Sequence, residues 1–241
     1  MRRLIRLFLA GWLVSNAAFA SAGELFASLE PLAVQIRGGL SALARDTGEA
    51  RRWHAAQLMH EGMDYRIRLR ARGNFRRATC RFPPLMLDFR DTKKGVLEGT
   101  LFDGQNRLKL VNQCERPVRS ATDLREEYLA YRIFNSLTDA SFRVRLLAVT
   151  WDDFEDLGKA GVRRTPPAFL IESSGELARR LGAPGQLDRM PVGARLEPAH
   201  ANLVAVFQYF IGNTDTIRFR AASAGASAAT TPRSSTLVGS C

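Results

Sequence analysis

A lysine on a predicted strand and two glutamates on the helix after it are the residues best suited to chemistry in this 241-residue chain. The lysine is Lys109, within the predicted strand 107–111, and the acids are Glu126 and Glu127. A lysine and a glutamate placed in this way can form the ion pair that positions nucleotide phosphates. Because Arg72-Gly73-Asn74 supplies a turn before that strand, the order of turn, strand and helix is that of a phosphate-binding lobe. The alternative is that Lys109 and the glutamates are solvated surface residues.

Other catalytic signatures are missing from the sequence. It contains no G-x-x-x-x-G-K-[ST] phosphate loop, no G-x-G-x-x-G fingerprint and no G-x-S-x-G nucleophile turn. The three histidines, His54, His60 and His200, lack the H-E-x-x-H spacing of zinc hydrolases, so no metal site is predicted. The acidic cluster at 152–156 lacks the alternating acids and the turn glycine of a calcium loop, which favours a solvated loop.

The three cysteines are too few for a disulfide scaffold and lack the C-x-x-C spacing of a metal site. Cys80 and Cys114 lie beside two predicted strands, so in an oxidising compartment we expect them to pair. Such a disulfide would close an interval of 33 residues and stabilise the fold by roughly 3–4 kcal/mol in the chain-entropy model. The alternative is a pair of buried thiols, and Cys241 is left over in either case.

The first 22 residues have the three parts of a secretion signal. Three arginines lie within residues 2–6, a short apolar run follows at 7–14, and small residues with A-x-A spacing come at 18–20 or 20–22. The alternative is an ordinary N-terminal helix. The apolar run is shorter than the ~20 residues of a membrane span, and no later run is long enough either. We therefore expect an exported mature chain, periplasmic or extracellular, without a transmembrane segment.

The net charge of +11 comes from 35 basic and 24 acidic side chains. The expected signal holds three of these positive charges and residues 216–241 hold another three, so the domain between them is only mildly basic. Residues 66–72 alternate arginine with apolar residues, which places the arginines on one face of a strand that could follow phosphates. The run lacks the interleaved aromatic residues of single-strand binders, which argues against nucleic acid as a partner.

Hydrophobic periodicity predicts an α+β fold, with an antiparallel sheet and flanking helices. Leu25, Leu29, Leu32 and Ile36 recur at helical spacing, so residues 23–62 are expected to form a helical segment. Period-two patterns predict strands at 63–72, 82–89, 97–101, 107–111, 142–150 and 168–171.

Later helices are expected from residue 120, at 176–181 and at 198–211. The first of these carries apolar residues over more than half its circumference, which predicts a largely buried helix. Residues 216–241 include 15 Ala, Ser or Thr and no apolar periodicity, so they are expected to form a disordered low-complexity tail.

Three short motifs occur in a suggestive order. They are Arg72-Gly73-Asn74-Phe75-Arg76, then Glu127-Tyr128-Leu129-Ala130-Tyr131-Arg132, then Phe210-Ile211-Gly212-Asn213-Thr214-Asp215. In type and order they resemble the CotH-like spore-coat kinase family, which has an atypical protein-kinase fold. The resemblance covers residues 63–215 and implies a kinase-like α+β domain that lacks most of its C-terminal lobe.

The resemblance also implies roles for single residues. Arg72, Gly73 and Asn74 would form the turn over the nucleotide, and residues 168–172 would lie near its adenine. Lys109 would contact the phosphates and pair with Glu127. Asp215 would be the base that accepts the proton of the substrate hydroxyl. ATP and magnesium are the cofactors that this resemblance implies.

The chain departs from the family pattern after Asp215. A kinase has an Asn five positions later and a further Asp for magnesium, but the fifth residue here is Arg220 and no Asn, Asp or Glu follows. Magnesium needs hard oxygen ligands, usually carboxylates, so phosphoryl transfer is not expected of this chain. A truncated or frame-shifted ending would explain the change in composition.

These observations predict a catalytically incomplete, pseudokinase-like exported protein that retains weak nucleotide binding through Lys109 and Glu127. Any activity would be that of an ATP-dependent phosphotransferase. The alternative is an exported structural or interaction module with no nucleotide role. A third hypothesis is binding of an anionic polymer through residues 66–72. The sequence assigns no substrate, partner or oligomeric state.

Overall fold

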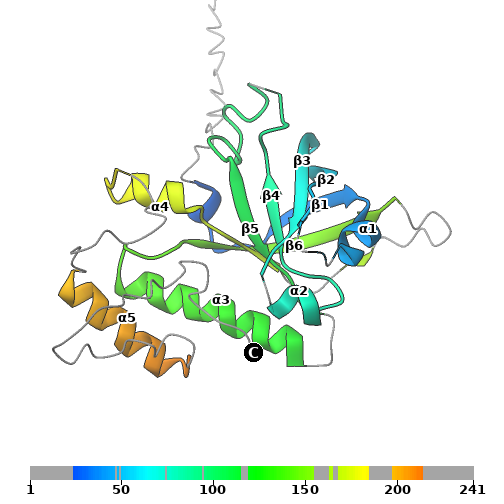
Figure 1. The fold of residues 1–241 in the computed structure, drawn as a ribbon. Coiled ribbons are helices and arrows are strands. Elements are labelled where there is room, and N and C mark those ends of the chain that lie inside the picture. Colours follow the sequence, from blue (N-terminus) through cyan, green and yellow to red (C-terminus); the bar gives the residue numbers. More distant parts are fainter. Residues whose placement is uncertain are drawn as a thin grey trace, which may run out of the picture.

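The computed structural model describes residues 24–46, 48, 50–73, 75–93, 95–114, 119–154, 163–164, 168–184 and 197–213. Most of these residues belong to one continuous sheet and to the helices around it (Figure 1). The expected signal at 1–22 and the expected tail at 216–241 lie outside the described residues.

Seven strands form a closed β-barrel. Their order around the barrel is β1 (Leu32–Gly38), β2 (His54–His60), β3 (Met63–Ala71), β4 (Leu85–Asp88), β5 (Arg107–Val111), β8 (Ala168–Ile171) and β6 (Val144–Asp153). The barrel closes because β6 pairs with β1 in parallel, from Leu32 opposite Leu147 to Gly38 opposite Asp153. All the other pairings are antiparallel, and the short strand β7 (Arg163–Arg164) adds to β6.

The closed mixed barrel corrects the expected fold class. The expected α+β fold of the kinase type, with an antiparallel sheet and flanking helices, is wrong for this chain. The decisive pairing joins β1 to β6, which are more than a hundred residues apart in the sequence. Periodicity reports which face of a strand is buried but not which strand lies beside it, so the sequence pattern gave no sign of this closure.

The described residues of the segment 23–62 do not form the helical segment that was expected. The segment contains a short 3-10 turn (Glu24–Phe26), β1, the six-residue helix α1 (Leu40–Arg45) and β2. Leu32, Val34 and Ile36 alternate into the interior, whereas Leu29 is exposed. The period-two alternation of Leu32, Val34 and Ile36 therefore determines the structure here, and the helical spacing that two of these positions share with Leu25 and Leu29 does not. Such alternation is expected of a strand that is buried on one face.

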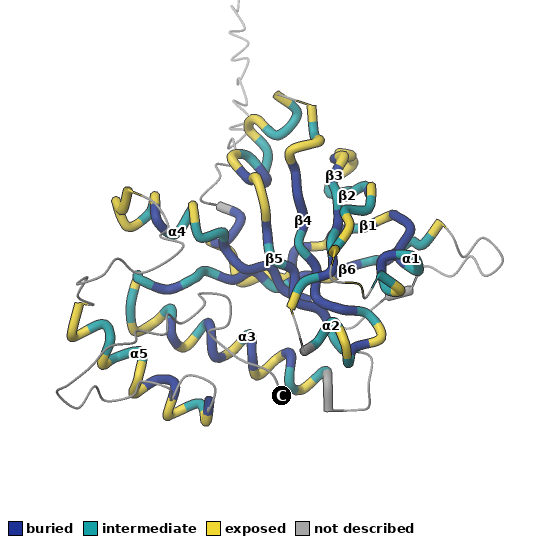
Figure 2. Tube along the Cα trace, in the orientation of Figure 1, coloured by how far each residue is buried: buried dark blue, intermediate teal, exposed yellow. Residues whose placement is uncertain are grey.

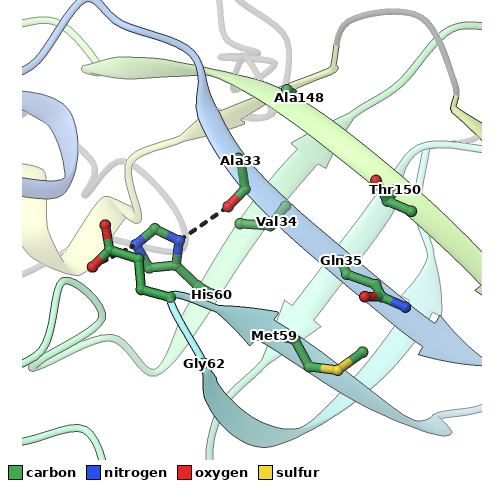
Figure 3. A pocket seen from close by; sticks show the side chains of 9 residues that line it. Ala33, Val34, Gln35, Met59, His60, Gly62, Ala148 and Thr150 are labelled. Atoms are coloured by element: carbon green, nitrogen blue, oxygen red, sulfur yellow. Dashed lines mark hydrogen bonds and ion pairs between the residues drawn. The ribbon is translucent and has the colours of Figure 1, made fainter.

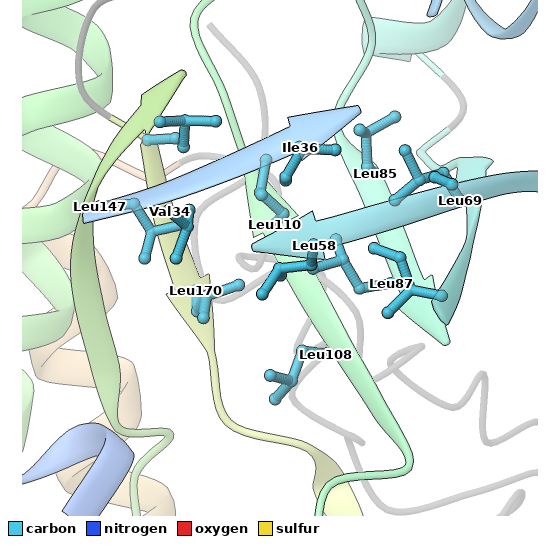
Figure 4. Close-up of a cluster of buried hydrophobic side chains, with 14 of the residues drawn as sticks. Val34, Ile36, Leu58, Leu69, Leu85, Leu87, Leu108, Leu110, Leu147 and Leu170 are labelled. Carbon is cyan, nitrogen blue, oxygen red and sulfur yellow. The ribbon is translucent and has the colours of Figure 1, made fainter. Parts of the chain in front are cut away.

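Apolar side chains from every strand of the closed sheet fill the barrel (Figure 4). On β3, the predicted alternation is confirmed, since Tyr65, Ile67 and Leu69 are buried. Phe102, from the turns that precede β5, stacks on Phe89 with ring centroids 5.4 Å apart. Each fully buried side chain of this size contributes about 1.5–3 kcal/mol, so the interior is the main source of stability.

The strand predicted at 97–101 is wrong, because those residues form turns. The acidic cluster has a structural role: Asp153 accepts hydrogen bonds from the backbone N–H groups of Leu40 (3.1 Å) and Ser41 (2.9 Å), at the beginning of α1. A carboxylate in this position satisfies N–H groups that a helix leaves unpaired.

Helix α3 (Arg119–Leu137) covers the outer face of the barrel (Figure 1). Its Leu124 and Tyr131 pack against Val111, Phe169 and other outward residues of β5, β6 and β8. On its far side, α5 (Pro198–Phe210) packs against it through Phe134 and Phe207, whose ring centroids are 4.7 Å apart.

The helices are less buried than their composition predicts (Figure 2). Leu129, Ile133 and Leu137 form an exposed stripe on α3, and Phe210 at the end of α5 is 71% exposed. The helices themselves are confirmed, as is α4 (Ser174–Arg180) in the predicted region. The expected burial of the whole α3 circumference is wrong because one barrel face and one helix cover only part of it.

Cys80 and Cys114 form the predicted disulfide, with Cα atoms 4.7 Å apart. The bond joins the residue after α2 (Phe75–Thr79) to the segment that follows β5. It is compatible with export to an oxidising compartment. None of the helices among the described residues combines the length and the apolar composition that a membrane span requires.

Candidate anion-binding site

Three of the predicted site residues meet between the outer face of the barrel and α3. Lys109 lies on β5 between Leu108 and Leu110, whose side chains fill the barrel, so its own side chain points outward. Arg72 follows the last residue of β3, and Glu127 lies on the barrel side of α3. Arg72 is close enough to both Lys109 and Glu127 for the charges to interact, although the fold that carries these residues differs from the expected one.

Glu127 is paired with Arg76 and not with Lys109. Arg76 lies on the short helix α2 and its Nη2 donates to Oε2 of Glu127 at 2.7 Å. Burial raises the pKa of the Glu127 carboxyl, and the charges of Arg76 and Arg72 oppose that shift. The predicted Lys109–Glu127 ion pair is not formed, because Arg76 of α2 occupies the Glu127 carboxylate instead.

Lys109 is a half-buried cation without a carboxylate among the described residues. Its Nζ lies 5.0 Å from the centroid of the Phe142 ring, at the distance of a cation–π contact. Burial, with a further contribution from the charge of Arg72, lowers the pKa of Lys109 to about 8. A fraction of the lysine is thus neutral near physiological pH.

Arg72 is the second such cation. Its backbone N–H donates to the carbonyl of Pro84 at 2.8 Å, but its guanidinium makes no hydrogen bond to any residue that the structure describes. Burial lowers the pKa of Arg72, while the nearby Tyr131 and Glu127 act in the opposite direction. Burial also raises the pKa of Tyr131, which keeps its hydroxyl protonated and able to donate.

The cluster therefore has more positive than negative charge. Arg72 lies close to both Lys109 and Glu127, and Glu127, the carboxylate that the described residues place in this cluster, is already paired with Arg76. A buried charge without a partner is costly. An anion that reached Arg72 and Lys109 would offset this cost and would receive charge-assisted hydrogen bonds.

The remaining predicted residues do not complete a kinase site. Gly73 has a φ of +80°, as expected for the turn, but Asn74 and Asp215 lie outside the described residues. At the end of the segment expected near an adenine, Glu172 is buried and binds Arg180 at 2.9 Å. That carboxylate is occupied by an ion pair of its own.

Sequence reasoning gave no role to Arg76, Tyr131 or Phe142. Arg76 follows Arg72 by four residues, and Tyr131 follows Glu127 by four. Because residues four apart on a helix lie on one face, the spacing of Tyr131 was a usable signal. Arg76 depends on a five-residue helix that the sequence did not predict.

A separate hollow lies on the outer side of β1, β2 and β6, away from this cluster (Figure 3). Its volume is about 310 Å³, and Gln35, Met59 and Thr150 are among the residues that line it. His60 contacts the carbonyl of Ala33 through Nδ1 at 3.0 Å. Its Nε2 is 3.9 Å from a carboxylate oxygen of Glu61, which is itself largely exposed. The hollow is open, and none of the predicted site residues lines it.

No family model matches the chain, and no curated protein matches its sequence significantly.

Proposed function

We propose that this chain is an exported binding module that holds the charged group of a small phosphorylated ligand between the barrel and α3. The observation that carries the proposal is the presence of two half-buried cations, Arg72 and Lys109, with no carboxylate of their own among the described residues. The signal-like start of the chain and the Cys80–Cys114 disulfide support the export part of it.

The chemistry of the donors favours phosphate. The arginine guanidinium presents a planar fork that matches phosphate oxygens, and the lysine ammonium adds a compact charge. The hydroxyl of Tyr131, which stays protonated, lies close enough for its charge state to affect Arg72. A nucleotide such as ATP is one ligand of this class. The proposal is one of binding and includes no transfer step.

A second candidate is a structural or interaction module without any ligand. The ion pair between Arg76 and Glu127 favours it, because this bond ties α2 to α3 and so has a purely structural use. The two proposals differ in what they predict for Lys109. A ligand site needs the positive charge of Lys109, whereas a structural module would be more stable without this half-buried charge.

Thermal unfolding of the full chain separates the two. We expect ATP and inorganic tripolyphosphate, both without metal, to raise the melting temperature by several degrees at concentrations well above Kd. Adenosine should have no effect. Lys109→Met should remove the response to both anions, while Arg125→Gln, which deletes an exposed charge elsewhere on α3, should keep it. No shift with either anion, or an equal shift in Lys109→Met, would overturn the ligand site and leave the structural module.

A further inference from the structure

A second cluster of arginines surrounds Trp53 on the outer face of β3 and β5. The guanidinium carbons of Arg68, Arg70 and Arg107 lie 5.3, 4.3 and 5.5 Å from the centroid of the Trp53 ring. Trp53 comes just before β2, and the register that pairs His54 with Leu69 brings it opposite Arg70. The proposed phosphate ligand does not require any of these residues.

Asp88 lies beneath this cluster and orients it. Its carboxylate is fully buried and is bound by Arg90 (2.6 Å), Arg107 (3.2 Å) and Arg68 (3.3 Å). Burial alone would raise the pKa of Asp88, but the hydrogen bonds from Arg90 and Arg107 outweigh it and hold that pKa well below its usual range. The anionic Asp88 thus fixes three guanidinium groups while cancelling only one of their charges.

Arg70 has no carboxylate partner among the described residues. Its guanidinium carbon lies over the Trp53 ring at 4.3 Å from the centroid, and burial, together with the charges of Arg107 and Arg51, lowers the pKa of Arg70. A guanidinium held over an aromatic ring can still donate N–H groups to a ligand and loses little rotamer freedom on binding. Arg70 is therefore prepared to bind an oxyanion.

The cations continue along the sheet as a strip. Arg66, Arg68 and Arg70 alternate along the outer face of β3, and Arg107 lies in the same row as Arg68, across β4. Successive rows on one face are about 6.6 Å apart, two residues along a strand. A row of charges at regular intervals suits an extended polymer better than a single small ion.

Two features of the strip determine which polymer it fits. Asp91, whose side chain is 48% exposed, pairs with Arg68 at 3.1 Å, so the strip is positive but of mixed sign. A dense phosphate backbone would be repelled by that carboxylate, whereas a hydroxyl group could donate to it. In addition, an arginine already lies over the Trp53 ring, so Trp53 is not a free aromatic platform for bases of the kind that single-strand binders use.

We propose that the outer face of β3–β5, with Trp53, Arg70, Arg68 and Arg107, binds an acidic polysaccharide. The spaced carboxylate or sulfate groups of the polysaccharide accept hydrogen bonds from the arginine N–H groups, and its neutral hydroxyl groups donate to Asp91. Electrostatic binding of this kind weakens with added salt, because the Debye length is only about 8 Å at physiological ionic strength.

The probe is a labelled oligogalacturonate, with its fully methyl-esterified form as the uncharged comparison and single-stranded poly(dT) as the nucleic-acid comparison. The full chain should bind the acidic oligomer at low salt, bind it more weakly as salt is added, and not bind the ester. Arg70→Gln should weaken binding about tenfold, the loss of one charge-assisted contact. Arg37→Gln removes an exposed arginine of β1 and lowers the net charge by the same amount as Arg70→Gln. It should change the affinity for the acidic oligomer less than twofold.

Several results would overturn this proposal. These are no binding of the acidic oligomer, equal binding of the ester, tighter binding of poly(dT), or equal weakening by Arg70→Gln and Arg37→Gln. Arg66→Gln, at an exposed position on the same face, is a second variant whose effect on folding should be negligible, and it too should weaken binding. Arg70→Gln should leave the response to tripolyphosphate intact, so the two proposed sites can fail independently.

Discussion

Asp88 and Glu127 are both buried carboxylates on the outer side of the same barrel, yet their surroundings differ in kind. Three arginines bind Asp88, whereas among the residues that the structure describes only Arg76 lies within hydrogen-bonding distance of Glu127. Accordingly the pKa of Asp88 is held low by its hydrogen bonds despite burial, and that of Glu127 is raised by burial.

The difference extends to the cations. Around Asp88 the arginines are partly exposed and share a carboxylate, so the cluster is satisfied and its spare charge faces outward. Around Glu127, Arg72 and Lys109 are half-buried and have no such partner among the described residues. The charges of the first cluster are paired within the protein, whereas the second is the cluster for which we propose an anion as the missing partner.

The largest expected effect comes from Asp88→Asn. Removing the charge leaves three arginines around a neutral buried amide, and breaking a buried ion pair costs about 3–5 kcal/mol. Urea unfolding at neutral pH measures it. Because the pKa of Asp88 is depressed in the folded state, its contribution is present above the unfolded pKa of about 3.9 and is lost as pH falls below that value. The difference between wild type and variant should therefore shrink in acid. A variant as stable as wild type at pH 7 would contradict the account of this cluster.

A smaller effect of opposite sign is expected for Lys109→Met. The pKa of Lys109 is lowered in the folded state, so the charged form opposes folding below about pH 8. Methionine fills a similar volume without the charge and should stabilise the chain on the order of 2 kcal/mol at pH 7. The advantage should diminish as pH rises from about 8 toward 10.5, where the unfolded lysine also becomes neutral. Destabilisation by Lys109→Met in the absence of ligand would show that the two clusters do not differ in this way.

The parts of the fold that could be predicted from the sequence are those set by local pattern. The alternation of Tyr65, Ile67 and Leu69 indicates β3, and Cys80 and Cys114 lie at the ends of segments that the sheet brings together. The closure of the barrel by β1 and β6 depends on a long-range parallel pairing. Nothing in the spacing of Leu32, Val34 and Ile36 specifies that partner.

The sequence pointed to some of the residues of the candidate site, but not to the ion pairs that they form. The order of turn, strand and helix brought Arg72, Lys109 and Glu127 together, but Arg76 takes the carboxylate that Lys109 was expected to bind. The Asp88 cluster was missed, although a carboxylate in the apolar run 85–89, close to several arginines, was a signal of a buried ion pair. Its partners Arg68 and Arg107 come from other strands and depend on the register of the sheet.

The most direct test of the contrast is the pKa of Lys109 itself, measured by NMR on the full chain with labelled lysine side chains and assigned with Lys109→Met. Without ligand the account predicts a pKa of about 8. Saturating tripolyphosphate should raise it toward the ordinary lysine value near 10.4, because a bound anion stabilises the charged form. An ordinary pKa in the free protein, or one that tripolyphosphate leaves unchanged, would contradict the claim that Lys109 carries an unpaired charge to which an anion binds.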